Sequence, residues 1–216
     1  MSDPIKKFVD VFSSLPGIGP RQATRLAFYL KNLGANNIQE ISDAVVGLNY
    51  LKTCSECFST HYQNQPQRKI GAPTEASEKT NADNLCSTCS NTQRNKGLIA
   101  IVEKETDLIS LEKTKKFNGR YLILGDLKKD GVLDSVQKLR LNSLKRSIKR
   151  DLSGQAEEII IAINPTTYGD INANLMLHEL KDYAKKISRL GRGIPTGGEI
   201  EFADEDTLGG ALDNRN

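Results

Sequence analysis

The sequence predicts an α/β protein with an N-terminal helix-hairpin-helix, a four-cysteine finger, a parallel-sheet domain and a short C-terminal tail. Three observations support this fold class. Two amphipathic stretches flank a Pro-Gly-Ile-Gly turn, four cysteines form two CxxC pairs, and apolar runs alternate with helical stretches after residue 97. A chain of 216 residues, 38% of them hydrophobic, can bury one large core or two small ones.

We expect the chain to divide into four segments without internal repeats. The hairpin region spans 1–53, the cysteine region 54–96, the α/β domain 97–190 and a tail rich in glycine and acid 191–216. The cysteine region contains a polar stretch, 63–84, with almost no apolar residues. Such a stretch cannot bury enough surface to offset its ordering entropy, so it predicts a flexible loop.

The hairpin region is predicted to be helical. Apolar residues at i, i+3, i+4 and i+7 mark the first helix: Ile5, Phe8, Val9 and Phe12. A tight turn over 15–20 leads into a second helix, from 21 to 32, with its own apolar stripe. A third helix is expected from about 38 to 51.

The turn between the first two helices has the chemistry of a phosphate-binding site. Gly17 and Gly19 allow close approach of the backbone, and the second helix presents unpaired N–H groups and its positive dipole end. Arg21 and Arg25 lie one turn apart and can reach neighbouring phosphates. The pattern therefore predicts DNA binding without sequence specificity. A plain helical hairpin, or one used for dimerisation, is the alternative.

The four cysteines predict one structural zinc ion per chain. Cys54 and Cys57 form one CxxC pair, and Cys86 and Cys89 form the other. Four thiolates suit a closed tetrahedral site without an open position. A redox dithiol pair and unrelated buried cysteines are the alternatives. His61 is a further candidate ligand, although a solvated loop histidine is the favoured interpretation.

The α/β domain is predicted from apolar runs that alternate with helices. Three strands are expected, over 98–102, 121–124 and 159–163. Helices are expected from near 107, from about 142 to 152 and from about 170 to 187. In the tail, a turn is predicted over 193–198 and a short strand over 199–202.

Acidic residues near the strand ends raise the question of catalysis. Glu103 follows the first strand, and ligands of parallel sheets gather at such carboxyl ends. Catalysis with magnesium needs several converging carboxylates, but Asn164 and Thr166 follow the third strand without charge. Asp107 and Asp170 are favoured as acids near helix N-termini. The sequence therefore predicts a protein without a catalytic site.

Weaker features leave alternatives open. The basic run at 145–146 and 149–150 suits either a second phosphate contact or a solvated helix face. His178 is expected to take part in helix packing. The formal charge of +3 is compatible with a nucleic-acid partner without requiring one.

The expected cellular compartment follows from two sequence signals that are absent. No apolar stretch reaches roughly the 18 residues of a membrane span, and the N-terminus lacks a secretory pattern. We therefore expect a cytoplasmic protein, in which reduced cysteines bind metal in preference to forming disulfides.

In the order of its elements the chain resembles the RecR family of bacterial recombination mediators, whose α/β domain is of the Toprim type. The likeness covers nearly the whole chain and includes both CxxC pairs. The other matching segments are 15–20, 101–103, 164–166 and Gly193-Ile-Pro-Thr-Gly-Gly-Glu199. Two departures are a longer insertion between Cys57 and Cys86 and the loop 125–131 after the second strand.

The resemblance implies more than the residue patterns do. RecR-like proteins form homo-oligomeric rings, bind DNA, and act with RecO, and often RecF, to place RecA on single-stranded DNA at gaps. Basic residues of the family's hairpin face DNA, which corresponds to Arg21 and Arg25. The Toprim domain docks RecO, which suggests a partner-binding role for Glu103, Asp107 and Asp170. The family also lacks the Asp-x-Asp pair of Toprim enzymes, in agreement with Asn164 and Thr166.

Two functions of other classes stay open as alternatives. A Toprim-type magnesium-dependent nuclease or primase would cut or extend DNA in a reaction that needs Glu103. A protein-only adaptor would use its hairpin to dimerise and would show no salt-dependent DNA binding.

Overall fold

A computed structural model describes residues 3–62 and 84–215 of the chain. The chain forms two compact units, which we describe separately: Met1–Leu51 with Tyr62–Asn64, and Lys52–His61 with Gln65–Asn216. The loop predicted over 63–84 lies outside the described residues except for Asn84. No helix in the described residues is long and apolar enough to cross a membrane.

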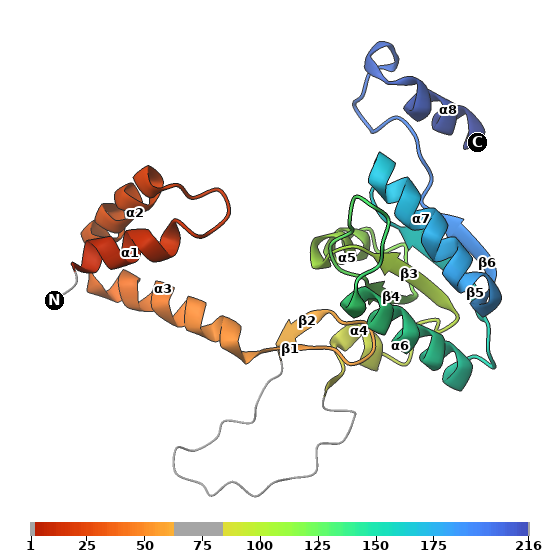
Figure 1. Cartoon of the computed structure of the whole chain (residues 1–216), viewed down its shortest axis with the longest axis horizontal. Helices are drawn as coiled ribbons and strands as arrows, with labels where there is room; N and C mark the ends of the chain where they lie inside the picture. Colours follow the sequence, from red (N-terminus) through yellow and green to blue (C-terminus); the bar gives the residue numbers. More distant parts are fainter. Residues whose placement is uncertain (1–2, 63–83, 216) are drawn as a thin grey trace, which may run out of the picture. The chain divides into compact units, whose positions relative to one another are not determined.

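The first unit consists of three α-helices and a short 3-10 turn (Figure 1). They are α1 (Pro4–Phe12), α2 (Pro20–Leu33), α3 (Ala35–Gly47) and η1 (Leu48–Tyr50). Asp3 caps α1 by accepting a hydrogen bond from the Ile5 amide at 3.0 Å. Gly34, at a φ of +89°, separates α2 from α3, a backbone conformation that favours glycine. The third helix begins three residues earlier than predicted. It also ends four residues earlier, because η1 and strand β1 (Leu51–Thr53) follow it.

The second unit contains a parallel sheet, which confirms the α/β class. Its strands are β3 (Leu98–Val102), β4 (Arg120–Ile123), β5 (Ala156–Ala162) and β6 (Ala184–Arg189), in the order β4-β3-β5-β6. Every neighbouring pair is parallel. Ile101 lies between Leu122 on one side and Ile161 on the other, so the apolar runs form the centre of the sheet.

Helices cover both faces of this sheet. They are α5 (Glu105–Lys113), α6 (Ser135–Asp151) and α7 (Thr167–Leu180). Buried side chains of α6 and α7 pack with Ile99, Ile101 and Ile161 in one cluster. The alternate residues Ala100 and Val102 pack with α5 and with the cysteine region in a second cluster. Because successive strand residues point to opposite faces, the two clusters are the two sides of one layered core.

Two of the predicted helices have different bounds in the structure. The helix expected over 142–152 begins at Ser135, where Asp134 and Gln137 form a capping box. The helix expected over 170–187 ends at Leu180, followed by η3 (Lys181–Tyr183) and β6. Residues 184–189 are a strand because they pair with β5, where Ile187 lies beside Ile159. Tertiary pairing therefore outweighs the helical pattern there.

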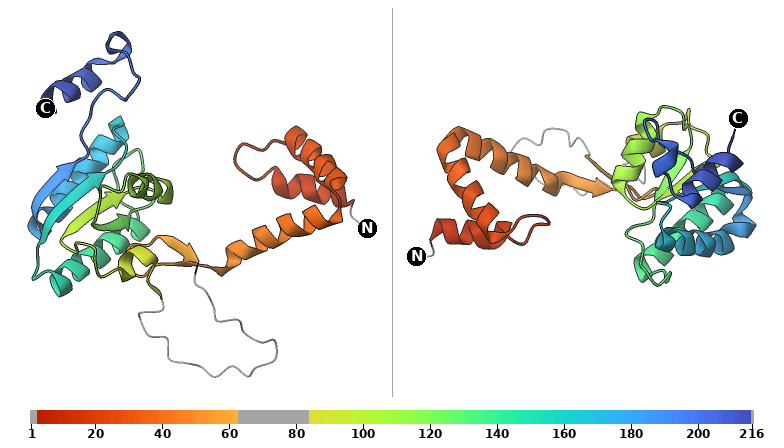
Figure 2. Two further views of the ribbon diagram at one scale, coloured as in Figure 1. Left: turned by 180° about the vertical axis from the view of Figure 1, so that it is seen from behind. Right: turned by 90° about the horizontal axis from the view of Figure 1, so that it is seen from above.

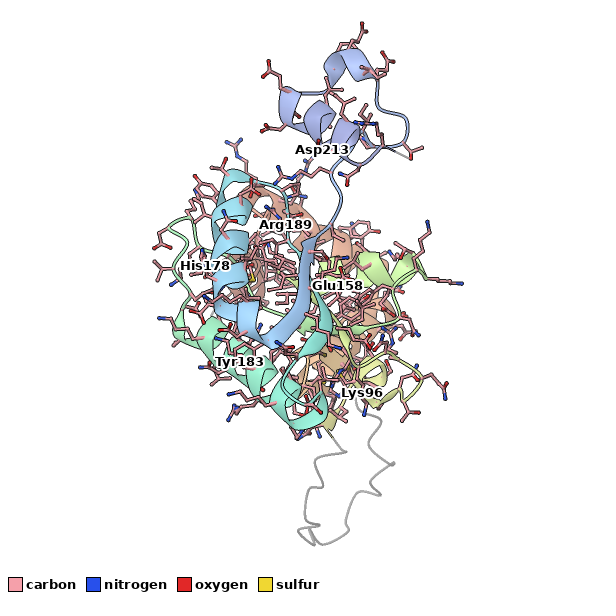
Figure 3. All side chains as sticks on the ribbon, turned by 90° about the vertical axis from the view of Figure 1, so that its right-hand side faces the viewer. Lys96, Glu158, His178, Tyr183, Arg189 and Asp213 are labelled. Atoms are coloured by element: carbon pink, nitrogen blue, oxygen red, sulfur yellow. The ribbon has the colours of Figure 1, made fainter. Side chains whose placement is uncertain are left out.

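The tail and one histidine also differ from prediction. The strand predicted over 199–202 is a 3-10 turn, η4 (Ile200–Phe202), since no strand within the described residues pairs with it. An unpredicted helix, α8 (Glu205–Asp213), follows and is capped by Asp204. His178, expected to pack, lies on the exposed face of α7 (Figure 3).

Candidate functional site

The four cysteines converge on one point of the second unit. Cys54 and Cys57 lie in the turn between β1 (Leu51–Thr53) and β2 (Thr60–Tyr62), and Cys86 and Cys89 lie at and within α4 (Ser87–Ser90). Their Sγ atoms all lie within 4.8 Å of one another. No disulfide joins them, and three of the four residues are buried. The structure thus brings together the two CxxC pairs across a long sequence separation.

This geometry fits a tetrahedral metal. Four thiolates at about 2.3 Å from zinc lie about 3.8 Å from each other, and the Cys57 and Cys86 sulfurs are 3.5 Å apart. A hydrogen bond with Cys57 is the main cause that lowers the pKa of Cys54 to about 6. A hydrogen bond with Cys54 is likewise the main cause that lowers the pKa of Cys86. A hydrogen bond with Cys54 is in turn the main cause that raises the pKa of Cys57 and of Cys89. Thiolates are the form that coordinates a metal, so a cation among the four sulfurs would favour ionisation of all four.

Backbone and ring contacts attach the first cysteine turn to the sheet. The Ile123 amide of the edge strand β4 donates to the Cys57 carbonyl at 2.9 Å. Phe58 follows with a φ of +63°, a strained conformation for a bulky side chain. The Arg140 guanidinium lies 5.3 Å from the Phe58 ring centroid and donates to the Ile123 carbonyl at 3.0 Å. The cysteine cluster is therefore joined to both β4 and α6.

His61 is not the solvated loop residue that the sequence suggested. It lies on β2, and both of its ring nitrogens are buried without a hydrogen-bond partner among the described residues. It does not belong to the group of four cysteines that could hold a metal. The candidate metal site therefore consists of the four sulfurs without this histidine.

The hairpin places its predicted residues at a helix N-terminus. Gly17 has a φ of +79°, and Gly19 is the N-cap of α2. In the described part of the chain, no side chain caps this end of the helix. Arg21 and Arg25 are exposed on its first two turns. The connection between α1 and α2 forms a projecting loop in each view of Figures 1 and 2.

The three predicted acidic residues each have local partners. Glu103 accepts from the Leu127 amide at 3.2 Å and thereby holds the loop after β4. Asp107 accepts from the Lys104 amide at 3.0 Å and caps α5. Asp170 forms an ion pair with Arg189 at 2.7 Å. The dominant hydrogen bond from Arg189 lowers the pKa of Asp170.

Asp107 and Asp170 line one cavity, whereas Glu103 does not. The cavity, of about 690 Å³, lies at the carboxyl ends of β5 and β6 and includes Asn164 and Thr166 in its wall. Thr166 accepts from the Gly169 amide at 3.0 Å and caps α7. A Cβ atom on Gly169 would come within 1.9 Å of the Asn164 carbonyl oxygen, so only glycine fits this corner.

The cationic side of this cavity is not evident from the sequence. Arg189 and Arg192 both contact the Asp170 carboxylate, and both line the cavity. No local motif links these arginines to Asp170, because they lie at and just beyond the end of a strand that was predicted to be mostly helical. The arrangement brings acidic and basic groups together at one sheet edge.

Comparisons with known families cover most of the chain. Residues 5–47 match the RecR helix-hairpin-helix, residues 97–191 the Toprim domain and residues 193–216 the RecR C-terminal region. The chain is 33% identical over 213 residues to Recombination protein RecR of Clostridium perfringens strain 13, which covers 98% of this chain and 95% of that protein. The protein of that name from C. perfringens strain ATCC 13124 matches to the same extent. The order of the elements, the cysteine cluster and this identity over nearly the full length show that the chain belongs to the RecR family.

Proposed function

We propose that this protein is a non-catalytic DNA-binding mediator of recombinational repair. It acts in the cytoplasm with RecO, and with RecF, to promote loading of RecA on single-stranded DNA at gaps. Membership of the RecR family and the name of its relatives, recombination protein, support the repair role. The observation that carries DNA binding is the pair of exposed arginines at the uncapped N-terminus of α2.

The α2 end is suited to a phosphodiester backbone. The first amides of a helix lack partners within the helix, and its dipole favours an anion there. Pro20 at the first position has no N–H, and Gly17 and Gly19 remove side chains that would hold a phosphate away. Arg21 and Arg25 add two charges on one face. These contacts bind phosphate and do not read bases.

Substitution of both hairpin arginines tests this role. We expect Arg21→Ala/Arg25→Ala to weaken binding of single-stranded and gapped DNA and to lower the log–log salt slope by about 0.7 to 0.9 for each phosphate that is no longer neutralised. Fluorescence anisotropy titrations at two salt concentrations measure both effects. Lys6→Ala/Lys7→Ala removes two exposed charges from α1 and should keep the slope. An unchanged slope in the arginine variant would favour the protein-only adaptor.

The four cysteines in this proposal hold one structural zinc ion per chain. The ion would join the β1–β2 turn to α4, and it would carry out no chemistry because all four positions are filled by sulfur.

We also propose the four parts 1–53, 54–96, 97–190 and 191–216 as functional segments of the chain.

The cavity at the carboxyl ends of β5 and β6, in the Toprim domain, supports partner binding better than catalysis. Asn164 and Thr166 carry no charge, Asp107 caps a helix and Asp170 is held by arginines. We propose the cavity edge with Asp107 and Asp170 as the RecO contact, beside the loop that Glu103 holds.

A magnesium-dependent nuclease or primase would behave differently in a direct assay. We expect the pure protein with Mg²⁺ to leave labelled single-stranded and nicked DNA intact and to extend no primer, because the carboxylates do not converge to hold the ion. Gel analysis over hours measures this. Strand cleavage or synthesis that disappears in Glu103→Gln would establish the enzymatic alternative.

Exposed apolar surface on the first unit supports homo-oligomerisation. Among its described residues only Ala23 is buried. Four apolar residues spaced three or four apart form an exposed stripe along α3 and into η1: Ile38, Ile41, Val45 and Leu48. In the tail, Phe202 is 79% exposed. Apolar surfaces of this kind mark contacts between proteins, so we propose a homo-oligomer, a dimer or a tetrameric ring.

A further inference from the structure

Helix α6 concentrates positive charge on the second unit. It carries six lysines and arginines and one acidic residue, so its excess of positive charge exceeds that of the whole chain, which is +3. Two of the six cations have their partners away from the groove described below. Arg140 donates to the Ile123 carbonyl, and Arg150 pairs with Glu56 at 2.9 Å and with Asp151 at 2.7 Å.

The other four cations line a single open groove. Lys145, Arg146 and Lys149 follow Lys138 by seven, eight and eleven residues, which puts all four on neighbouring parts of one helix face. They line a groove of about 710 Å³ together with Ser135, Leu139, Asn142 and Tyr183. No acidic side chain is among these lining residues.

Two of the lysines are held in place. Both ammonium groups lie over the Tyr183 ring, at 5.4 Å for Lys145 and 5.5 Å for Lys149. Glu179 binds the Lys145 ammonium at 2.6 Å, and the three other groove cations form no ion pair within the described residues. Figure 3 shows Tyr183 beside α6. Side chains ordered in advance lose less entropy when an anion binds.

We propose that this groove is a second binding site for the sugar-phosphate backbone of DNA, separate from the hairpin. Lys138 and Lys149 are about 16 Å apart along the helix, the length of roughly five nucleotides at duplex spacing. Asn142 and Ser135 add the neutral donors that commonly bind phosphate oxygens. The Tyr183 ring orders lysines here and is not free to stack on a base. The site therefore binds the backbone without sequence preference.

The inference rests on the proposed DNA binding of the protein. A comparison of four variants separates the contribution of the groove from that of the hairpin. The groove variant is Lys138→Gln/Arg146→Gln, which removes two exposed cations that line the groove and do not belong to the buried side of α6. Its matched control, Lys113→Gln/Lys116→Gln, removes two exposed lysines at and beyond the end of α5. The hairpin variant Arg21→Ala/Arg25→Ala and the combination of hairpin and groove changes complete the set.

We expect the groove variant to lower the salt slope by about 0.7 to 0.9 for each phosphate that it no longer neutralises. For two such phosphates, the weakening of binding over a fourfold rise in salt becomes about tenfold smaller. The α5 control keeps the wild-type slope, Arg146→Lys retains binding, and the combined variant loses both contributions. Circular dichroism and the melting temperature check that each variant is folded.

Other outcomes would distinguish the groove proposal from the hairpin proposal or overturn one or both of them. A groove variant with the wild-type slope and affinity overturns the groove, whatever the hairpin variant does. If only the groove variant loses binding, the groove stands and the hairpin role fails. If DNA binding is unchanged but binding to phosphatidylserine vesicles is lost, the groove is a membrane contact and the DNA assignment is wrong. If the wild-type protein binds no DNA at low salt, both proposals fail.

Discussion

The Cys86→Ser variant should lose its zinc and much of the stability of the second unit. A structural zinc site contributes on the order of 10 kcal/mol in isolated finger peptides, so loss of one ligand costs several kcal/mol. For a chain of this length each kcal/mol shifts the melting temperature by about 2 to 4 °C. We expect a decrease of at least about 10 °C. Differential scanning calorimetry and elemental analysis measure the two effects.

The effect should extend beyond the cysteines themselves. Cys86 is buried among residues of one sheet face, and the Cys57 carbonyl accepts a bond from β4. Ser87→Ala, next to the ligand on the exposed side of α4, is the matched control and should keep one zinc per chain. Since thiolates must form before metal binds, the affinity should also fall as the pH is lowered. A wild-type protein without metal, or a Cys86→Ser variant that melts like wild type, would contradict a structural zinc site.

The Ile41→Asp/Val45→Asp variant should separate the homo-oligomer into smaller species. These side chains lie one turn apart on the exposed stripe of α3, and Val45 is 58% exposed in the chain by itself. A second copy that covers the stripe would have to bury two unpaired carboxylates, which costs several kcal/mol. We expect the dissociation constant of the oligomer to rise at least about a hundredfold. Sedimentation velocity over a concentration series measures this change.

The control adds charge to the other side of the same helix. Asn36→Asp introduces a carboxylate at an exposed polar position off the stripe, in the first turn of α3, and should leave the assembly unchanged. Because the stripe is exposed within one chain, the helix content of both variants should match wild type in circular dichroism. A wild-type protein that sediments as a monomer at micromolar concentration would rule out the proposed use of this face.

Local sequence patterns predict much of the candidate site. Strand 98–102 has the predicted bounds, because an unbroken apolar run can only be satisfied at the centre of a covered sheet. The CxxC spacing predicted the metal cluster, since two thiols three residues apart already share one turn. Gly17 has the left-handed conformation that its place in the turn favours.

Other features depend on contacts between distant residues. The segment 184–189 is a strand because β5 offers it backbone partners. Asp170 is held by Arg189 and Arg192, which lie at and just beyond the end of that strand. The Lys145 and Lys149 ammonium groups meet over Tyr183, whose position follows from the end of α7. None of these pairings has a short-range signal in the chain.

By itself, the sequence determined the class of fold, the family resemblance, the four cysteines of the candidate metal site and the hairpin at which we propose DNA binding, since each is encoded by residue type at short spacing. Only the tertiary structure decided which cations have structural partners and which line the α6 groove. It also decided that the ring nitrogens of His61 are buried and that Asp107 and Asp170 share a cavity without Glu103. The physical reason is the sequence separation over which each feature is set. Hydrophobic periodicity and ligand spacing involve residues only a few positions apart, whereas burial and charge pairing depend on distant residues that folding brings together.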